Sequence, residues 1–140
     1  MALPNHIQLQ IVSADRSLVH EQVDEVEIPG ADGYFGVLPG HTPLLALLGA
    51  GELWYRQGQE KHYLMLAFGF AEVQPDRVTI LAEIAEAAAE IDLARAEAAR
   101  TRAEQRLMAP AADMDAERAR IALLKSLIRI QVAARARTRA

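Results

Sequence analysis

The sequence predicts an α+β protein, in which an N-terminal antiparallel β-sandwich of about eight to ten short strands precedes a C-terminal antiparallel helical hairpin. Short stretches of alternating apolar and polar residues, separated by turn residues, fill the chain as far as Leu81. Beyond them, ten of the 26 residues from 84 to 109 are alanine and none is glycine, which favours helix. The expected domains are a sandwich over residues 1–86 and a hairpin over residues 87–140.

The first strands are predicted from alternation. Residues 5–13 alternate apolar and polar side chains, and residues 17–28 repeat the pattern, as half-buried strands do. Residues 28–48 are rich in turn formers, with glycines at 30, 33, 36 and 40 and prolines at 29, 39 and 43. Because glycine accepts positive φ and proline fixes φ, the backbone must turn repeatedly there. The apolar runs Tyr34–Leu38 and Leu44–Leu48 within it are expected to be strands or buried corners.

Further strands are predicted at residues 52–56, 62–66, 68–73 and 78–81. Residues 57–59 are expected to form the hairpin turn between the first two of these strands, and residues 74–77 to join the last two. Trp54 and the phenylalanines are expected to be core residues, because large aromatic side chains are mostly buried.

Two amphipathic helices are expected to follow, joined by a short loop around Pro110. Asp92 is the expected N-cap of the first helix, and its buried face is predicted to hold Leu93, Ala96, Ala103 and Leu107. Asp113 or Asp115 is expected to cap the second helix, whose wide apolar face would hold Ile121, Leu124, Leu127, Ile128 and Val132. The end of the chain, residues 135–140, is expected to fray. Because alanine buries little area, the hairpin should pack thinly, as a movable arm would require.

The composition excludes several classes of function. The chain has no cysteine, and its four histidines lack metal-binding spacing, so a metal site is not expected. No apolar run approaches the roughly 20 residues of a membrane span, and the first residues do not resemble a secretory signal. The glycines between residues 30 and 40 are not followed by the Gly-Lys-Ser/Thr of a phosphate loop. With 5% aromatic residues and a net charge of −4, nucleic acid is not an expected partner.

No arrangement of residues predicts catalysis. His41, in Pro-Gly-His-Thr-Pro, has no carboxylate or nucleophile with a readable pairing. A histidine on such a turn is more often a surface or contact residue. No Ser/His/Asp set or carboxylate pair can be recognised in the sequence, so we expect no catalytic residue in this chain.

The charge is divided unevenly along the chain. Residues 1–83 hold 4 Lys/Arg against 11 Asp/Glu, a net charge of −7. Residues 84–115 hold 4 against 7, a net charge of −3, and residues 116–140 hold 7 against 1, a net charge of +6. An acidic N-terminal part and a basic C-terminal part suggest that the two parts bind different partners, or that they attract each other.

Basic residues form a stripe on each predicted helix. On a helical wheel the first stripe, with Asp92 a turn before it, holds Arg95, Arg102 and Arg106. The second holds Arg118, Lys125 and Arg129. If the stripes face each other they form a polyanion site, because guanidinium groups suit phosphate oxygens. If they face outward they are solvated surfaces, which is the commoner case. The residues alone leave both readings open.

Several motifs converge on one family. Ile28-Pro-Gly-Ala-Asp-Gly together with Gly36-Val-Leu-Pro-Gly-His-Thr-Pro-Leu-Leu resembles the signature of the epsilon subunit of bacterial F-type ATP synthases. Gly69-Phe-Ala-Glu-Val and Val78-Thr-Ile-Leu-Ala-Glu resemble the last strands of that family, and Ile91-Asp-Leu-Ala-Arg-Ala resembles its helix-start motif. The match runs in order over nearly the whole chain.

The resemblance implies a non-catalytic, peripheral subunit of a proton-translocating rotary machine. The sandwich would sit at the foot of the central stalk, between the gamma subunit and the ring of c subunits. The hairpin would permit turnover when folded down, and would inhibit ATP hydrolysis when extended toward the alpha and beta subunits. Its basic second helix would then meet an acidic segment of beta. The absence of a transit peptide and the Ala/Arg-rich composition suggest the cytoplasmic face of a bacterial inner membrane.

The resemblance also implies site residues. No cofactor is required, but in some members the folded hairpin binds ATP, and the matching positions are Glu86, Asp92, Arg95, Arg102, Lys125 and Arg129. Lys125 stands where ATP-binding relatives carry arginine, so the bidentate fork is lost there. His41 matches a histidine that faces gamma, and Tyr34 stands where relatives often carry a glutamate that contacts the c-ring. The alternative function is a freestanding ATP-sensing module, which the two basic stripes suggest.

Overall fold

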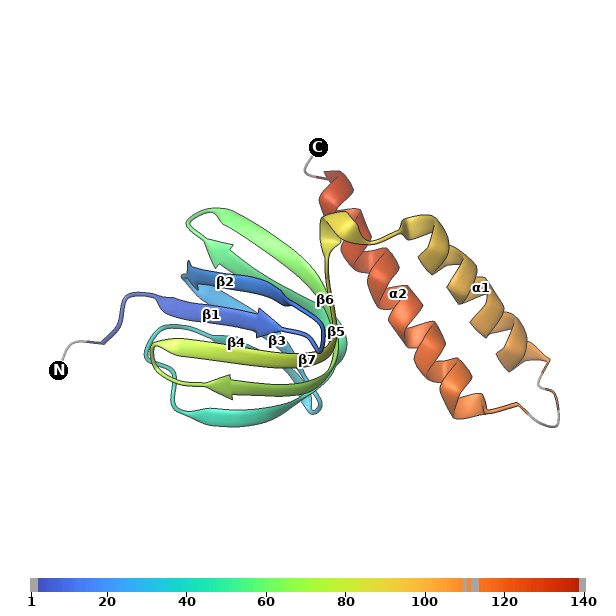
Figure 1. Ribbon diagram of the computed structural model, residues 1–140, viewed down its shortest axis with the longest axis horizontal. Helices are drawn as coiled ribbons and strands as arrows, with labels where there is room; N and C mark the ends of the chain where they lie inside the picture. The colour runs from blue at the N-terminus through green and yellow to red at the C-terminus, as the bar shows by residue number, and fades with distance from the viewer. Residues whose placement is uncertain (1–2, 110, 112–113, 139–140) are drawn as a thin grey trace. The chain divides into compact units, whose positions relative to one another are not determined.

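The computed structural model describes residues 3–109, 111 and 114–138. The chain forms two compact units, which divide between Ala87 and Ala88. The first unit consists of strands and the second of helices (Figure 1). The strands are β1 (Ile7–Val12), β2 (Ser17–Val23), β3 (Glu25–Gly30), β4 (Gly33–Val37), β5 (Leu44–Gln57), β6 (Glu60–Val73) and β7 (Arg77–Ala87). A single 3-10 turn (Ala88–Glu90) precedes the helices α1 (Leu93–Met108) and α2 (Ala116–Thr138). The α+β class and the sandwich-then-hairpin order are confirmed.

The strands of the first unit form one hydrogen-bonded sheet in the order β2-β1-β7-β6-β5-β3-β4. This sheet curves over on itself, so the two layers of the sandwich are continuous through the long strands (Figure 1). The predicted antiparallel pairing holds for the sheet except at one place, where β1 and β7 run parallel. A parallel pair needs a long crossover, and here the five intervening strands provide it.

The described residues form seven strands, and not eight to ten, because predicted strands merge. β5 joins the apolar runs 44–48 and 52–56, and β6 joins 62–66 and 68–73. At the junction in β6, Phe68 and Gly69 have φ values of 64° and 118°. Pairing with β5 and with β7 keeps one register on both sides of this junction. The positive φ values change which face the side chains occupy without ending the strand, so a change of phase in the sequence is not a strand boundary.

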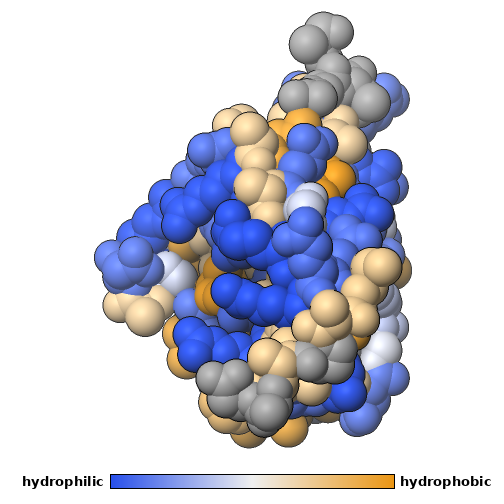
Figure 2. Space-filling model, turned by 90° about the vertical axis from the view of Figure 1, so that its right-hand side faces the viewer, coloured by the Kyte–Doolittle hydropathy of each residue, from blue (hydrophilic) through white to orange (hydrophobic). Residues whose placement is uncertain are grey.

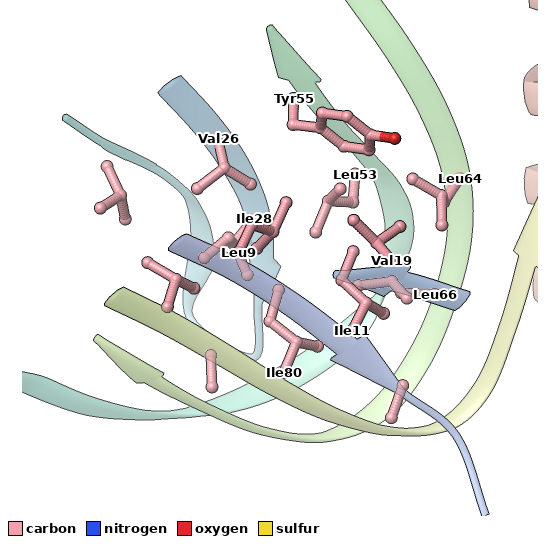
Figure 3. Close-up of a cluster of buried hydrophobic side chains, with 14 of the residues drawn as sticks. Leu9, Ile11, Val19, Val26, Ile28, Leu53, Tyr55, Leu64, Leu66 and Ile80 are labelled. Atoms are coloured by element: carbon pink, nitrogen blue, oxygen red, sulfur yellow. The ribbon is translucent and has the colours of Figure 1, made fainter. Parts of the chain in front are cut away.

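The apolar core lies between the two layers of the sheet (Figure 3). Alternate residues of several strands fill it, and those with no exposed surface include Ile7, Leu9, Ile11, Ile28, Leu53, Leu66 and Ile80. The aromatic residues follow the prediction only in part, since Phe35 is partly buried and packs against the core. Phe70 is 50% exposed, because the pleat turns its neighbour Ala71 into the core. Trp54 is only partly buried, and the Lys61 ammonium lies 4.1 Å from the centroid of its ring.

A polar network joins the corner between β2 and β3 to the predicted hairpin turn between β5 and β6. The carboxylate of Asp24 accepts a hydrogen bond from Gly58 N–H at 2.7 Å and lies 3.0 Å from His6 Nδ1. The hydrogen bond from Gly58 is the main reason that the pKa of the Asp24 carboxyl lies below its ordinary value, and the contact with His6 is the second. Arg56 donates to Glu25 Oε1 at 3.0 Å beside it. These contacts fix one end of the sandwich.

The helix starts follow the sequence. Arg95 N–H donates to Asp92 Oδ1 at 3.1 Å, so the predicted N-cap of α1 is confirmed. Arg118 N–H donates to Asp115 Oδ1 at 3.1 Å, so Asp115 caps α2. The alternative cap Asp113 and the predicted breaker Pro110 lie outside the described residues. α2 continues to Thr138, so the expected fraying is wrong for residues 135–138. Residues 139–140 lie outside the described part of the chain.

The hairpin packs through small residues. The buried residues of α1 are Ala96 and Ala103, seven apart, and α2 has a matching series at Ala119, Ser126 and Ala133. Ile128 and Val132 of α2 are also buried, but Leu124 and Leu127 are 43% and 40% exposed. The predicted apolar face is therefore buried only in part, because Leu124 lies about 200° around the helix from the buried Ser126. Since alanine buries little area, α1 adds little packing energy.

Candidate functional site

An exposed apolar row crosses the outer face of the sandwich. Leu47 of β5 pairs with Phe70 of β6, and Phe70 pairs with Leu81 of β7. Directly paired residues point to the same face, about 5 Å apart, so the three side chains lie side by side. Their exposed fractions are 60%, 50% and 54%, and Leu45, two residues before Leu47 on the same face, is 71% exposed. Scattered apolar residues are ordinary on a surface, but a contiguous group marks an interaction site. We call these four residues the apolar row.

A groove of about 550 Å³ lies beside the apolar row. The residues from Gly30 to Phe35, which hold the turn between β3 and β4, form one wall, and Leu44–Leu47 form the other. Its volume lies within the range of about 300–1,000 Å³ that is usual for ligand pockets.

Tyr34, the predicted c-ring contact, lies on β4 at this groove and is 56% exposed. Its hydroxyl accepts a hydrogen bond from Glu52 N–H at 3.1 Å, so the side chain lies over β5. A Cβ at Gly51 would collide with the Tyr34 hydroxyl oxygen. Sequence reasoning missed this anchor, although a glycine inside a strand is a signal of close approach by another group.

His41, the predicted gamma contact, lies in the loop between β4 and β5 and is partly exposed. Its Nδ1 lies 2.6 Å from the carbonyl oxygen of Thr42. A carbonyl only accepts, so Nδ1 donates in this contact. The adjacent Gly40 N–H donates to Pro75 O at 2.8 Å, which holds this loop on the turn between β6 and β7. The orientation of the histidine ring is thus fixed by its own loop.

The hairpin has a groove of about 410 Å³ between its helices. Ala99 lines it from α1, and α2 contributes Asp115, Glu117, Arg118, Ile121, Ala122, Lys125 and Arg129. The structure therefore brings the predicted residues Lys125 and Arg129 together, with Arg118 beside them. The two acidic residues have partners of their own, since Asp115 caps α2 and Glu117 accepts from Arg120 at 2.9 Å. Three cations along one groove make it suited to a polyanion.

The other predicted ATP residues lie outside the lining of this groove. Arg95 and Arg102 are exposed on α1, four residues before and three residues after Ala99, so they share its side of the helix. Asp92 is engaged as the N-cap of α1. Glu86 lies on β7, in the first unit. The face of the molecule shown in Figure 2 is mainly hydrophilic.

Two kinds of feature are absent from the described residues. No group of three or more His, Asp or Glu side chains is placed to hold a metal ion. No described helix combines the length and the apolar character needed to cross a membrane.

Family models match both units. Residues 6–88 match the β-sandwich domain of the ATP synthase delta/epsilon chain, and residues 89–134 match the long α-helix domain of the same chain. The chain belongs to the ATP synthase delta/epsilon family. The resemblance to epsilon subunits drawn from the motifs is confirmed.

Relatives named ATP synthase epsilon chain align over almost their full length. The protein from Solibacter usitatus is 44% identical over 131 residues, which cover 94% of this chain and 98% of the relative. Epsilon chain 2 of Syntrophotalea carbinolica is 47% identical, with 92% and 94% covered. The relative from Syntrophobacter fumaroxidans is 48% identical, with 91% and 95% covered.

One solved structure agrees with this assignment, and a second shows the same fold. A chain of the Euglena gracilis mitochondrial ATP synthase, in an assembly of OSCP, F1 and c-ring, superposes with a TM-score of 0.83 at 26% identity. The match covers 96% of this chain and 84% of that chain. A chain of the central stalk and c-ring of the Tetrahymena thermophila enzyme shares the fold, with a TM-score of 0.58 at 13% identity.

Proposed function

We propose that this chain is a non-catalytic coupling subunit of a proton-translocating ATP synthase at the cytoplasmic face of a bacterial inner membrane. In this role the sandwich joins the gamma subunit to the c-ring, and the hairpin inhibits ATP hydrolysis when it extends toward the alpha and beta subunits. The observation that carries the coupling role is the apolar row on the outer face of the sandwich.

The apolar row supports a protein partner in preference to a small substrate. It is a surface of four large apolar side chains, each at least half exposed. Burying such a side chain contributes about 1.5–3 kcal/mol, so covering the row supplies a large part of the free energy of a stable interface. Only the surplus over the cost of association appears as affinity. Tyr34 and His41, each fixed by a hydrogen bond within the sandwich, are the proposed contacts to the c-ring and to gamma.

Replacing Phe70 with glutamate is expected to weaken binding of the purified gamma subunit by about 30-fold, as for loss of an aromatic anchor at the centre of an interface. Phe70 is half exposed, so the melting temperature of the free chain should change little. Isothermal titration calorimetry measures the affinity. The matched control is Leu124→Glu, which charges an exposed apolar residue of the hairpin. An unchanged affinity for the Phe70→Glu variant would refute this surface as the gamma contact.

The inhibitory role of the hairpin is supported by its charge and its packing. Residues 116–140 carry 7 Lys/Arg against 1 Asp/Glu, so α2 presents a basic surface to an acidic partner. The buried residues of α1 are two alanines, which oppose separation of the helices only weakly. A hairpin with these properties can exchange its internal contacts for contacts with another subunit.

A second candidate function, regulatory ATP binding by the hairpin, is supported by the groove that Arg118, Lys125 and Arg129 line. The expected result is saturable binding of ATP to the purified chain, with or without magnesium, measured by calorimetric titration. Arg129→Ala should weaken it by about tenfold or more, since a hydrogen bond to a charged group contributes 1.5–3 kcal/mol. Arg95→Ala tests the contribution of the basic stripe on α1. The control is Arg100→Ala, which removes only the exposed ion pair with Glu104. Absence of binding at millimolar ATP would disprove this candidate.

A further inference from the structure

The first residues of β5 form a strand edge that is covered on one side only. β5 pairs with β6 from Leu44 onward, but its pairing with β3 reaches only to Leu48. The last bond on the β3 side runs from Ala31 N–H to the carbonyl oxygen of Leu47, at 2.8 Å. Backbone groups of alternate residues in a strand point to the same side, so those of Leu45 face the same way as those of Leu47. In the described part of the chain, no strand pairs with Leu45 on that side.

This edge is apolar and open to solvent. Leu44 and Leu45 are 41% and 71% exposed, and Leu47 is 60% exposed. An exposed edge with unpaired N–H and C=O groups is a template for another strand, and proteins usually protect such edges with charges. No Lys or Arg is among the described residues that line the groove beside this edge. The edge therefore lacks the usual protection against pairing with another strand.

The charge around the edge indicates the chemistry of what covers it. The groove on one side of Leu45 contains Asp32, and a smaller hollow of about 380 Å³ on the other side contains Glu72. Residues 1–83 as a whole carry 4 Lys/Arg against 11 Asp/Glu. A segment that is apolar at alternate positions and flanked by Lys or Arg complements this edge.

We propose that Leu44–Leu47 is a strand-addition site, at which an extended segment of the gamma subunit pairs with the N–H and C=O of Leu45. The identity of the partner rests on the proposed function. The mode of contact rests on the one-sided pairing of β5. Leu45 and Leu47 belong to both the edge and the apolar row, so one partner covers the row with side chains and extends the sheet with its backbone.

Amide hydrogen exchange of the ¹⁵N-labelled chain, followed by NMR, tests the proposal directly. In the free chain the Leu45 amide should exchange quickly, and binding of purified gamma should slow it by about 100-fold or more. The Ala46 amide is an internal control, because it points toward β6 and is protected already. A Leu45 amide that exchanges as quickly in the complex as in the free chain would overturn the proposal.

A pair of variants separates backbone from side chain. Leu45→Pro removes the N–H and blocks an incoming strand, whereas Leu45→Ala removes only the side chain. Proline is tolerated where the N–H faces solvent, so both variants should melt close to the parent. Leu45→Pro should bind gamma about tenfold more weakly than Leu45→Ala, the cost of a lost backbone pairing.

Three results contradict the proposal in distinguishable ways. If gamma binds the parent chain but the two variants bind it equally, the edge is not used and the coupling role stands. If gamma does not bind the parent chain at all, the proposed function fails together with the strand addition. If the Leu45 amide becomes protected in the free chain as its concentration rises, with a dimer in sedimentation, the occupant is a second copy of this chain and not gamma.

Discussion

Replacing Gly69 with alanine is expected to destabilise the sandwich by about 3 kcal/mol or more. Gly69 has a φ of 118°, which side-chain-bearing residues rarely adopt, and a Cβ there would collide with the carbonyl oxygen of Leu81. Neither partner can move freely, because both belong to paired strands. For a domain of this size the melting temperature should fall by roughly 12 °C or more.

The fluorescence of Trp54 measures this effect, because it is the chain's single tryptophan and lies in the sandwich. The matched control is Gly58→Ala in the hairpin turn. Gly58 also has a positive φ, 63°, but a Cβ there would meet no atom within 4 Å. This control should lose only about 1 kcal/mol. Equal losses in the two variants would show that the close approach of Gly69 to Leu81 does not constrain the sheet.

Removal of the hairpin, residues 88–140, is expected to leave a folded sandwich that binds gamma and to accelerate ATP hydrolysis by the reconstituted complex. The sandwich should fold alone, because every residue of its core cluster lies between Ile7 and Ala85. If the hairpin holds about nine-tenths of the complexes in an inhibited state, its loss raises the hydrolysis rate about tenfold. Steady-state ATPase assays on complexes with full-length and shortened chains measure the change.

Two controls make this result interpretable. Trp54 fluorescence should show the same unfolding transition for the sandwich in both chains, and calorimetry should show the same affinity for gamma. Hydrolysis that is unchanged in complexes that contain the shortened chain would argue against the inhibitory role. It would leave the coupling role of the sandwich untouched, because that role depends on the apolar row.

Local features of the fold could be predicted from residues close together in the chain. Asp92 caps α1 and Gly58 lies in a hairpin turn because side-chain capping and positive φ depend on only a few neighbouring residues. Part of the hairpin site was predictable for the same reason. The spacing of Arg118, Lys125 and Arg129 places them on one side of a helix, and the structure finds all three along one groove.

The sequence by itself therefore determined the fold class, the family, the strand periodicity and the helix starts. The tertiary structure alone decided which face of each strand is covered, since alternation divides a strand into two faces without saying which one packs. For this reason Phe70, predicted for the core, lies exposed in the apolar row, and the run from Leu44 to Leu48 forms a partly uncovered edge. The parallel pairing of β1 with β7 was likewise decided by contacts between the first and last strands of the sandwich. These strands are far apart in the sequence, so no local pattern predicts that they pair.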